Sequence, residues 1–184
     1  MITSPPVSLG MFRPPRLRRA AAAGVAAAVA LIGLPQEAQA EVKVGVEVRG
    51  ELMRRFNVQP YGGPSVAVDL GYSFDTYPIM VIPELTLVGA FYAPEIYTGS
   101  FRALGGLRVG AALEVEPTIY VRGGYLGIFG RDVPDHGGVF EAGAAIDKRL
   151  ERSLTIGGSL GYQGFFAPRW AHGMAAGFHV GFWL

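Results

Sequence analysis

The sequence predicts an eight-stranded, antiparallel, up-and-down transmembrane β-barrel that follows a cleavable helical signal peptide. The strongest observation is the final stretch, residues 174–184, in which bulky apolar side chains alternate with mostly small ones up to the last residue. Such a strand is a hazardous open edge unless another strand pairs with it and its apolar face is covered. A membrane barrel meets both needs, because closure pairs the edge and lipid covers the face. Earlier segments with the same period and an N-terminal leader complete the prediction.

Residues 1–40 are expected to be a signal peptide that is removed. Four arginines precede an apolar run over residues 20–34, and Ala38-Gln39-Ala40 is a small-residue cleavage site. The run is shorter than the roughly 20 residues that a membrane anchor needs. We therefore expect cleavage near Ala40–Glu41 and a barrel over residues 41–184. The first ten residues carry no charge, which leaves Met1 and Met11 as alternative starts.

Composition narrows the class of the remaining chain, which is long enough for one domain. The 184 residues carry a formal net charge of +1, and the leader holds four of the arginines, so the predicted barrel is slightly acidic. That balance gives no reason to expect a nucleic acid partner. The absence of cysteine excludes lipoprotein attachment and disulfides. No segment after the leader has a helical period or a run long enough for a membrane helix, so membrane insertion requires a barrel.

Eight segments alternate between apolar side chains and polar or small ones. In the first, valines at even positions from Val42 to Val48 alternate with Lys43, Gly45, Glu47 and Arg49. The third is expected to start at Pro83, because proline has no N–H to donate to a closed ladder. Segments of about ten residues match tilted strands that cross a bilayer. The eight segments are residues 42–49, 66–74, 84–92, 101–113, 118–127, 140–147, 154–163 and 174–184.

The predicted connectors alternate in length, which is the outer-membrane pattern of short turns at one end and longer loops at the other. The turns are residues 75–78, 114–117 and 147–152, and the loops are residues 53–63, 93–100, 128–137 and 165–169.

Aromatic residues near the strand ends predict two belts at the membrane interfaces. The turn-end belt would hold Tyr72, Phe74, Tyr77, Phe182 and Trp183. The loop-end belt would hold Phe91, Tyr92, Phe101, Phe129, Phe165, Phe166 and Trp170. Ordinary core aromatics are the alternative interpretation.

Alternation alone fits both a membrane barrel and a soluble lipocalin-like barrel. The polar faces of the last two segments separate them, because neither face contains a residue that is formally charged at neutral pH. A face in water should carry many Lys and Glu side chains. Small residues suit the crowded lumen of a narrow barrel, so the membrane version is favoured.

The leader, the eight alternating segments and the apolar last strand resemble the small eight-stranded outer-membrane barrels, such as the membrane domain of OmpA and OmpX. The resemblance implies a Gram-negative outer membrane, export through the Sec translocon, insertion by the barrel-assembly machinery, contact with outer-membrane lipid and lipopolysaccharide, and a monomer. Unlike OmpA, this chain is not expected to carry a peptidoglycan-binding domain after the barrel. The last strand of such barrels typically ends in Phe, whereas this one ends in Leu184. Its expected assembly signal is Phe178, Val180, Phe182, Trp183 and Leu184.

The inward faces predict a balanced set of charges in a narrow lumen. Five basic and five acidic residues point inward: Lys43, Glu47, Arg49, Asp69, Glu84, Arg102, Arg108, Arg122, Glu141 and Asp147. We expect a lumen charge network of Glu47, Arg49, Asp69, Glu84, Arg108, Arg122 and Glu141. Because unpaired buried charges are costly, such groups pair and plug a lumen that is already too narrow for a wide pore. The alternative is a narrow porin-like channel for ions or small solutes, lined by the same groups.

Catalysis is not expected. Barrels that modify lipid A carry a Ser-His-acid arrangement, but His172 and His179 are seven residues apart and so face opposite sides of their strand, and neither precedes a serine in an H-x-S pattern. His136 lies near Asp132 and Asp135, which suggests only a weak metal site. There is no phosphate loop, zinc motif or dinucleotide fingerprint, so neither a cofactor nor a metal is expected.

Surface interaction through the loops is a third possibility. Residues 53–56 and 130–132 offer charged and aromatic groups. Four arginines are candidates for contact with lipopolysaccharide phosphates: Arg54, Arg55, Arg131 and Arg169. The plainer interpretation is solvated loop charge. The sequence therefore predicts a structural or surface-interaction role and names no ligand.

Overall fold

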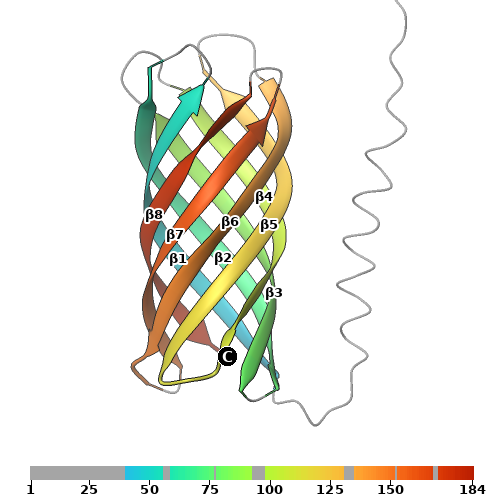
Figure 1. Cartoon of the computed structure of the whole chain (residues 1–184), viewed down its shortest axis with the longest axis vertical. Coiled ribbons are helices and arrows are strands. Elements are labelled where there is room, and N and C mark those ends of the chain that lie inside the picture. The colour runs from blue at the N-terminus through green and yellow to red at the C-terminus, as the bar shows by residue number, and fades with distance from the viewer. Residues whose placement is uncertain are drawn as a thin grey trace, which may run out of the picture. The chain divides into compact units, whose positions relative to one another are not determined.

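The computed structural model describes residues 40–55, 59–76, 78–92, 98–130, 135–151, 153–167 and 170–184. In this part of the chain eight strands form one closed barrel in chain order (Figure 1). The strands are β1 (Ala40–Arg55), β2 (Tyr61–Thr76), β3 (Ile79–Tyr92), β4 (Thr98–Ala111), β5 (Val115–Phe129), β6 (Asp135–Arg149), β7 (Leu154–Phe166) and β8 (Ala171–Trp183). The predicted eight-stranded antiparallel up-and-down barrel is confirmed. The predicted leader and its cleavage site lie outside the described residues, apart from Ala40.

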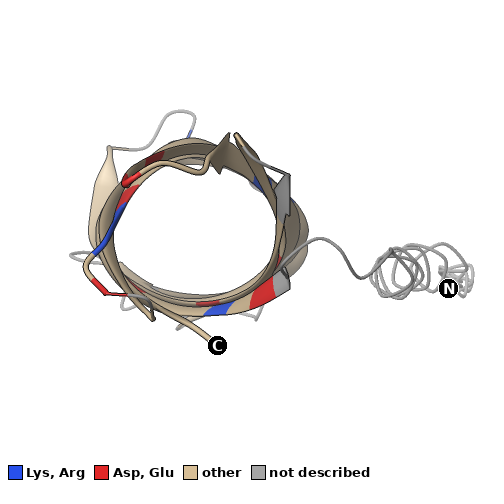
Figure 2. Ribbon diagram, turned by 90° about the horizontal axis from the view of Figure 1, so that it is seen from below, with Lys and Arg blue, Asp and Glu red and all other residues tan. Residues whose placement is uncertain are grey.

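The barrel closes where β1 pairs with β8. Their antiparallel register runs from Lys43 opposite Trp183 to Arg55 opposite Ala171. Val42 and Leu184 extend it by exchanging two backbone hydrogen bonds of 3.1 and 2.9 Å. The apolar last strand is therefore paired on both sides, with β7 as its other neighbour, and the end-on view shows the strands as one continuous ring (Figure 2).

The strands are longer than the alternation predicted, with 13 to 16 residues each. Segments expected in loops belong to strands, for example Met53 in β1 and Ser100 in β4. The physical reason lies in the lumen near the loop end, where inward positions are apolar, as in Met53, Leu126 and Phe165. The contrast between the two faces fades there, so a real strand resembles an irregular apolar stretch.

The prediction that Pro83 marks the start of the third strand is wrong, because Pro83 is the fifth residue of β3. The β2–β3 register runs without a break from Ser65 to Gly71 and resumes at Phe74 opposite Val81. The gap falls where Pro83 would pair, as expected for a residue without an N–H. The opposite side of β3 is continuous, with Pro83 opposite Leu107 of β4.

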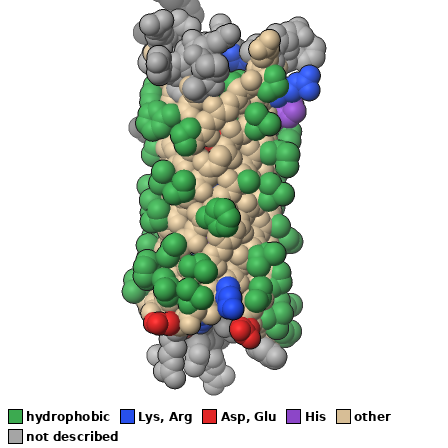
Figure 3. Space-filling model, turned by 90° about the vertical axis from the view of Figure 1, so that its left-hand side faces the viewer, with side chains coloured by type: hydrophobic (Ala, Val, Ile, Leu, Met, Phe, Trp, Pro, Cys, Tyr) green, Lys and Arg blue, Asp and Glu red, His purple; other side chains and the backbone are tan. Residues whose placement is uncertain are grey.

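The outer wall is apolar over most of its height. Large apolar side chains are exposed on all eight strands, for example Val48 (61%), Ile119 (67%) and Phe178 (82%). On the face that Figure 3 shows, such side chains cover the wall, and charged side chains lie near its two margins. An exposed apolar surface of this extent is the surface that a transmembrane barrel presents to lipid. None of the described residues forms a helix long and apolar enough to cross a membrane.

Not every aromatic residue assigned to the two belts faces outward. Tyr92, Phe165 and Trp183 are 7%, 3% and 4% exposed and lie in the lumen. Each is next to an outward-facing aromatic residue in the chain, so the alternation of a strand sends one ring of each pair inward. The exposed rings are Phe91, Phe101, Phe129, Phe166 and Trp170 at the loop end, and Tyr72 and Phe182 at the turn end. Tyr77 lies outside the described residues.

Candidate functional site in the barrel lumen

The lumen is filled by side chains in three successive layers, and the inward face of β3 displays them in order. Met80 and Ile82, near the turn end, pack in an apolar cluster with Trp183. Glu84 and Thr86 follow, and both belong to the charged layer. Val88, Ala90 and Tyr92 then join a larger apolar cluster at the loop end. The charged layer around Glu84 therefore has apolar packing on both sides.

Arg122 of β5 is the hub of the charged layer. Its Nε donates to Glu84 Oε1 at 2.6 Å, and its Nη1 lies 3.5 Å from Asp69 Oδ1 and 3.7 Å from Glu141 Oε1. These carboxylates come from three other strands, β3, β2 and β6. The Arg122 side chain is 1% exposed and packs over the Tyr120 ring, with 4.3 Å between the guanidinium carbon and the ring centroid. One arginine thus ties four strands together across the lumen.

The network continues from this hub in two directions. On one side Glu141 accepts from Arg49 at 3.1 Å, and Arg49 donates to Glu47 at 2.6 Å. On the other side Glu84 accepts from Arg108 at 3.0 Å, and Arg108 lies 3.7 Å from Asp147. All seven residues of the predicted lumen network thus lie in one connected set.

Asp147 extends the network beyond those seven residues toward the turn end. Lys43 donates to Asp147 Oδ2 at 2.9 Å, and His179 Nε2 contacts the other carboxylate oxygen. Lys43 also lies 5.3 Å from the centroid of the Trp183 ring. The contribution of His179 was missed, because an uncharged face was expected on β8, although its inward position could be read from the alternation.

Glycines on β7 and β8 make room for these long side chains. A Cβ on Gly157 would lie 2.5 Å from His179 Nε2, and one on Gly177 would lie 2.7 Å from Glu47 Oε1. Real Cβ atoms do not approach so closely, so the small, uncharged face predicted for these strands is a steric requirement of the charged groups opposite.

A second buried group lies nearer the loop end, around Arg102 of β4. Its guanidinium contacts Glu51 and Gln163, and both partners in the ion pair have fully buried side chains. Glu51 also accepts from Tyr92 at 2.8 Å and from Gln163 at 3.0 Å. Glu51 was missed because the first segment was ended at Arg49. Continuing its odd positions by one more step would have found it.

An apolar collar surrounds this second group. Here the collar means the ten buried residues of the loop-end cluster, and every strand of the barrel contributes at least one. Its bulky members Met53, Leu104, Leu126 and Phe165 are 0–3% exposed, and Tyr92 is 7% exposed. The full set is Met53, Ala67, Val88, Ala90, Tyr92, Leu104, Leu126, Val139, Phe165 and Ala171. No sequence argument predicted this ring, because apolar residues at inward positions look like loop or belt residues.

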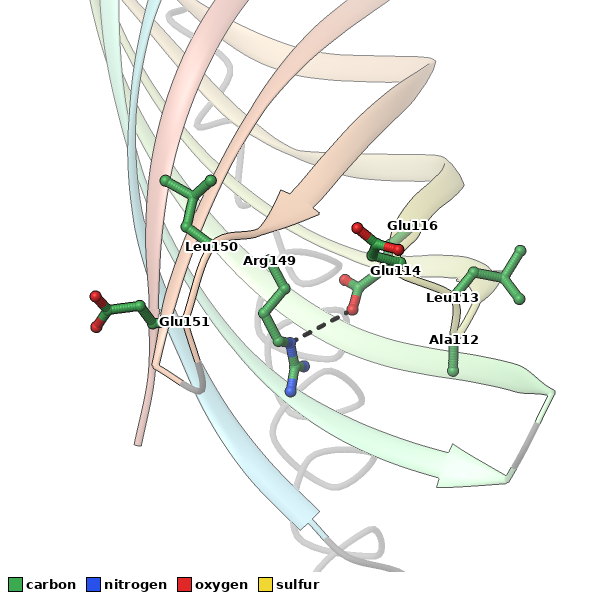
Figure 4. Close-up of a pocket in the computed structure, with 7 residues that line it drawn as sticks. All are labelled: Ala112, Leu113, Glu114, Glu116, Arg149, Leu150 and Glu151. Carbon is green, nitrogen blue, oxygen red and sulfur yellow. Dashed lines mark ion pairs between the residues drawn. The ribbon is translucent and has the colours of Figure 1, made fainter.

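An open cleft of about 440 Å³ lies at the turn end, between the β4–β5 and β6–β7 connections (Figure 4). Arg149 crosses it, with Nε 3.6 Å from Glu116 Oε1 and Nη2 3.5 Å from Glu41 Oε2. The guanidinium carbon also lies 4.8 Å from the centroid of the Trp183 ring. Arg149 of β6 therefore links to Glu41 of β1 and Glu116 of β5 at the turn end.

The remaining predicted residues are distributed over both faces. Of the expected assembly signal, Phe178, Val180, Phe182 and Leu184 are exposed, whereas Trp183 is buried in the lumen. His172 faces outward and His179 inward, so β8 separates them. Asp132, Arg131 and Arg169 lie outside the described residues. Among the described residues no three His, Asp or Glu side chains are grouped as a metal site requires.

Comparisons with known proteins bear on the fold. No protein-family model and no curated protein sequence matches this chain. Among solved structures, neisserial surface protein A is 9% identical with a TM-score of 0.63, covering 77% of this chain and 96% of its own. Ail of Yersinia pestis is 9% identical with a TM-score of 0.51, covering 78% and 98%. Ail in complex with the heparin analogue sucrose octasulfate gives 10% identity and a TM-score of 0.50, covering 79% and 99%. The chain has the fold of the small eight-stranded outer-membrane barrels.

Proposed function

We propose that the protein is an integral outer-membrane barrel with a structural or surface-interaction role and a lumen that does not conduct. Membrane insertion is supported by the wall, where large apolar side chains are exposed on every strand. Export through the Sec translocon and insertion by the barrel-assembly machinery accompany this proposal, with the exposed Phe178, Val180, Phe182 and Leu184 as the face of the assembly signal. Catalysis has no support from His172 and His179, which lie on opposite faces of β8.

The apolar collar is the observation that carries the closed lumen. Charged groups alone do not decide the question, because rings of charge also line ion channels. The collar adds apolar side chains from all eight strands around the paired Arg102 and Glu51, and an apolar constriction of this kind disfavours the entry of water and ions. The ion pairs beneath it place opposite charges against one another across the barrel, which weakens the net attraction for a passing ion of either sign.

Single-channel recording in planar bilayers tests this proposal. The wild-type protein is expected to be silent, whereas the double substitution L104A/F165A removes two large collar side chains and should admit brief currents. L107A is the matched control, because Leu107 is 46% exposed on the outer wall of the same strand as Leu104. Steady wild-type current would instead establish the alternative, a narrow channel for ions or small solutes.

The partner proposed for the surface is outer-membrane lipid, including lipopolysaccharide. Ail, which shares this fold, has been crystallised with sucrose octasulfate, a heparin analogue, so a barrel of this shape can hold a polyanion. In this chain Arg54 is exposed at the loop end, where an arginine suits phosphate groups.

A further inference from the structure

The outer wall has a one-sided charge pattern. Every acidic side chain described in the strands occupies an inward-facing position, as in Glu51, Glu84 and Glu141. At the outward positions described in the strands, every ionisable side chain of the Asp, Glu, Lys, Arg or His type is basic, and each lies near a strand end. They are Arg54, His136 and His172 at the loop end and Lys148 at the turn end.

Two of these groups lie side by side where the barrel closes. Arg54 is the last residue but one of β1 and lies directly opposite His172, the second residue of β8. Residues opposite each other in an antiparallel pair have Cβ atoms about 5 Å apart, so both side chains can reach one ligand group. No described residue forms an ion pair or a side-chain hydrogen bond with Arg54. Arg54 is exposed, and within the described part of the chain its N–H donors are not taken up by another side chain.

Aromatic rings hold the imidazole of His172 in place. Trp170 stacks on it with ring centroids 5.1 Å apart and planes at 29°, and the Tyr162 ring lies 5.9 Å away. Trp170 and Tyr162 are themselves 50% and 45% exposed on the wall. Trp and Tyr with this exposure select the headgroup depth of a bilayer, which places Arg54 and His172 at the same depth.

We infer that Arg54 and His172 form a binding site for the phosphate of an anionic lipid headgroup, on the outer wall at the β1–β8 seam. Arg54 supplies the charge and a planar fork of N–H donors, and His172 supplies a ring N–H at a fixed orientation. Leu52 and Met174 are exposed on the same two strands, two residues closer to the middle of the barrel. The acyl chains of a lipid whose headgroup is bound at the site would run over them. The inference rests on the membrane insertion proposed above.

Tryptophan quenching by brominated lipid tests the site, because Trp170 lies in it and Trp183 is buried in the lumen near the other end. The full chain is inserted into phosphatidylcholine bilayers that contain a small fraction of either dibrominated phosphatidic acid or dibrominated phosphatidylcholine. Each variant is normalised to its own unbrominated bilayer. We expect phosphatidic acid to quench as though it were enriched about fivefold around Trp170, a modest value for exposed charge-assisted hydrogen bonds.

In the double variant R54Q/H172Q, quenching by brominated phosphatidic acid should fall to the level seen with brominated phosphatidylcholine. The variant K148Q, at the opposite rim, should keep the preference for phosphatidic acid. Equal quenching by both lipids in the wild-type protein, or an unchanged preference in R54Q/H172Q, overturns the inference. So does loss of the preference on adding inorganic phosphate, because the site would then take free phosphate. Failure of insertion is distinct from all of these, since neither brominated lipid would then quench and the lipid-inserted protein would be absent.

Discussion

Replacing Arg122 by leucine should be among the most damaging substitutions in the lumen. The change removes the cation that bridges Glu84, Asp69 and Glu141, and it leaves those carboxylates in a layer closed by apolar packing on both sides. Breaking a buried ion pair by removing one partner costs about 3–5 kcal/mol, because the remaining charge is desolvated without compensation.

The three carboxylates do not suffer equally. Glu84 keeps Arg108 at 3.0 Å and Glu141 keeps Arg49 at 3.1 Å. Among the described residues, the direct contact that Asp69 keeps is the hydroxyl of Thr86, which donates to it at 2.5 Å; Arg108 and Arg49 act on it from further away. Most of the loss should therefore come from Asp69, and adding D69N to R122L should recover about 2 kcal/mol by removing that charge.

Urea unfolding of the barrel in lipid vesicles, followed by the mobility shift on unheated gels, measures these free energies. Lys148→Leu is the control, since Lys148 is exposed at the turn end and its replacement should change stability by no more than about 0.5 kcal/mol. The reasoning is refuted if R122L loses less than about 1 kcal/mol, the value typical of an exposed pair. It is also refuted if D69N adds to the damage of R122L instead of relieving it.

Three further predictions follow from the packing. G157V should abolish the SDS-resistant, fast-migrating form on unheated gels, because its Cβ would collide with His179 Nε2, whereas G50V, where a Cβ meets nothing within 4 Å, should keep it. A176R places an arginine near the middle of the lipid-facing side of β8, so the free energy of unfolding measured in lipid should fall by about 2–4 kcal/mol. Aqueous acrylamide should quench the fluorescence of W170F poorly before urea is added and strongly afterwards, because the remaining Trp183 is 4% exposed; strong quenching of the folded form would contradict the lumen packing.

The sequence was sufficient to predict the strand number, the order and the two faces, because all three depend on a period of two that survives in most of the chain. It was insufficient for strand ends. Pro83 was treated as a boundary, yet a barrel strand accommodates it by leaving a gap in one ladder while keeping the other. Met53 and Phe165 were placed in loops because their inward positions are apolar, and no local pattern distinguishes an apolar lumen layer from an irregular segment.

The members of the lumen network could be inferred from the sequence, because a charged side chain at an inward position of a narrow barrel must lie in the lumen. The pairing of its members could not be inferred. Arg49 and Glu141, for example, form an ion pair across the lumen although they are 92 residues apart in the chain. Such contacts depend on strand tilt and on which glycines clear a path, and neither can be obtained from the alternation of a single strand. The collar is a further step away, because it exists only when eight strands each place an apolar group at the loop-end part of the lumen.

The division of labour between the two lumen layers follows from what each contributes physically. The ion pairs link strands that are distant around the barrel, so their loss should appear in stability and not in permeability. The collar consists of the apolar side chains that fill the lumen at the loop end. Truncating these side chains should therefore raise the permeability of the barrel as well as lower its stability. A result in which R122L opens the lumen while L104A/F165A leaves it closed would reverse these assignments, and it would make the charged layer the barrier. The two sets of variants therefore test the same lumen from both of its layers.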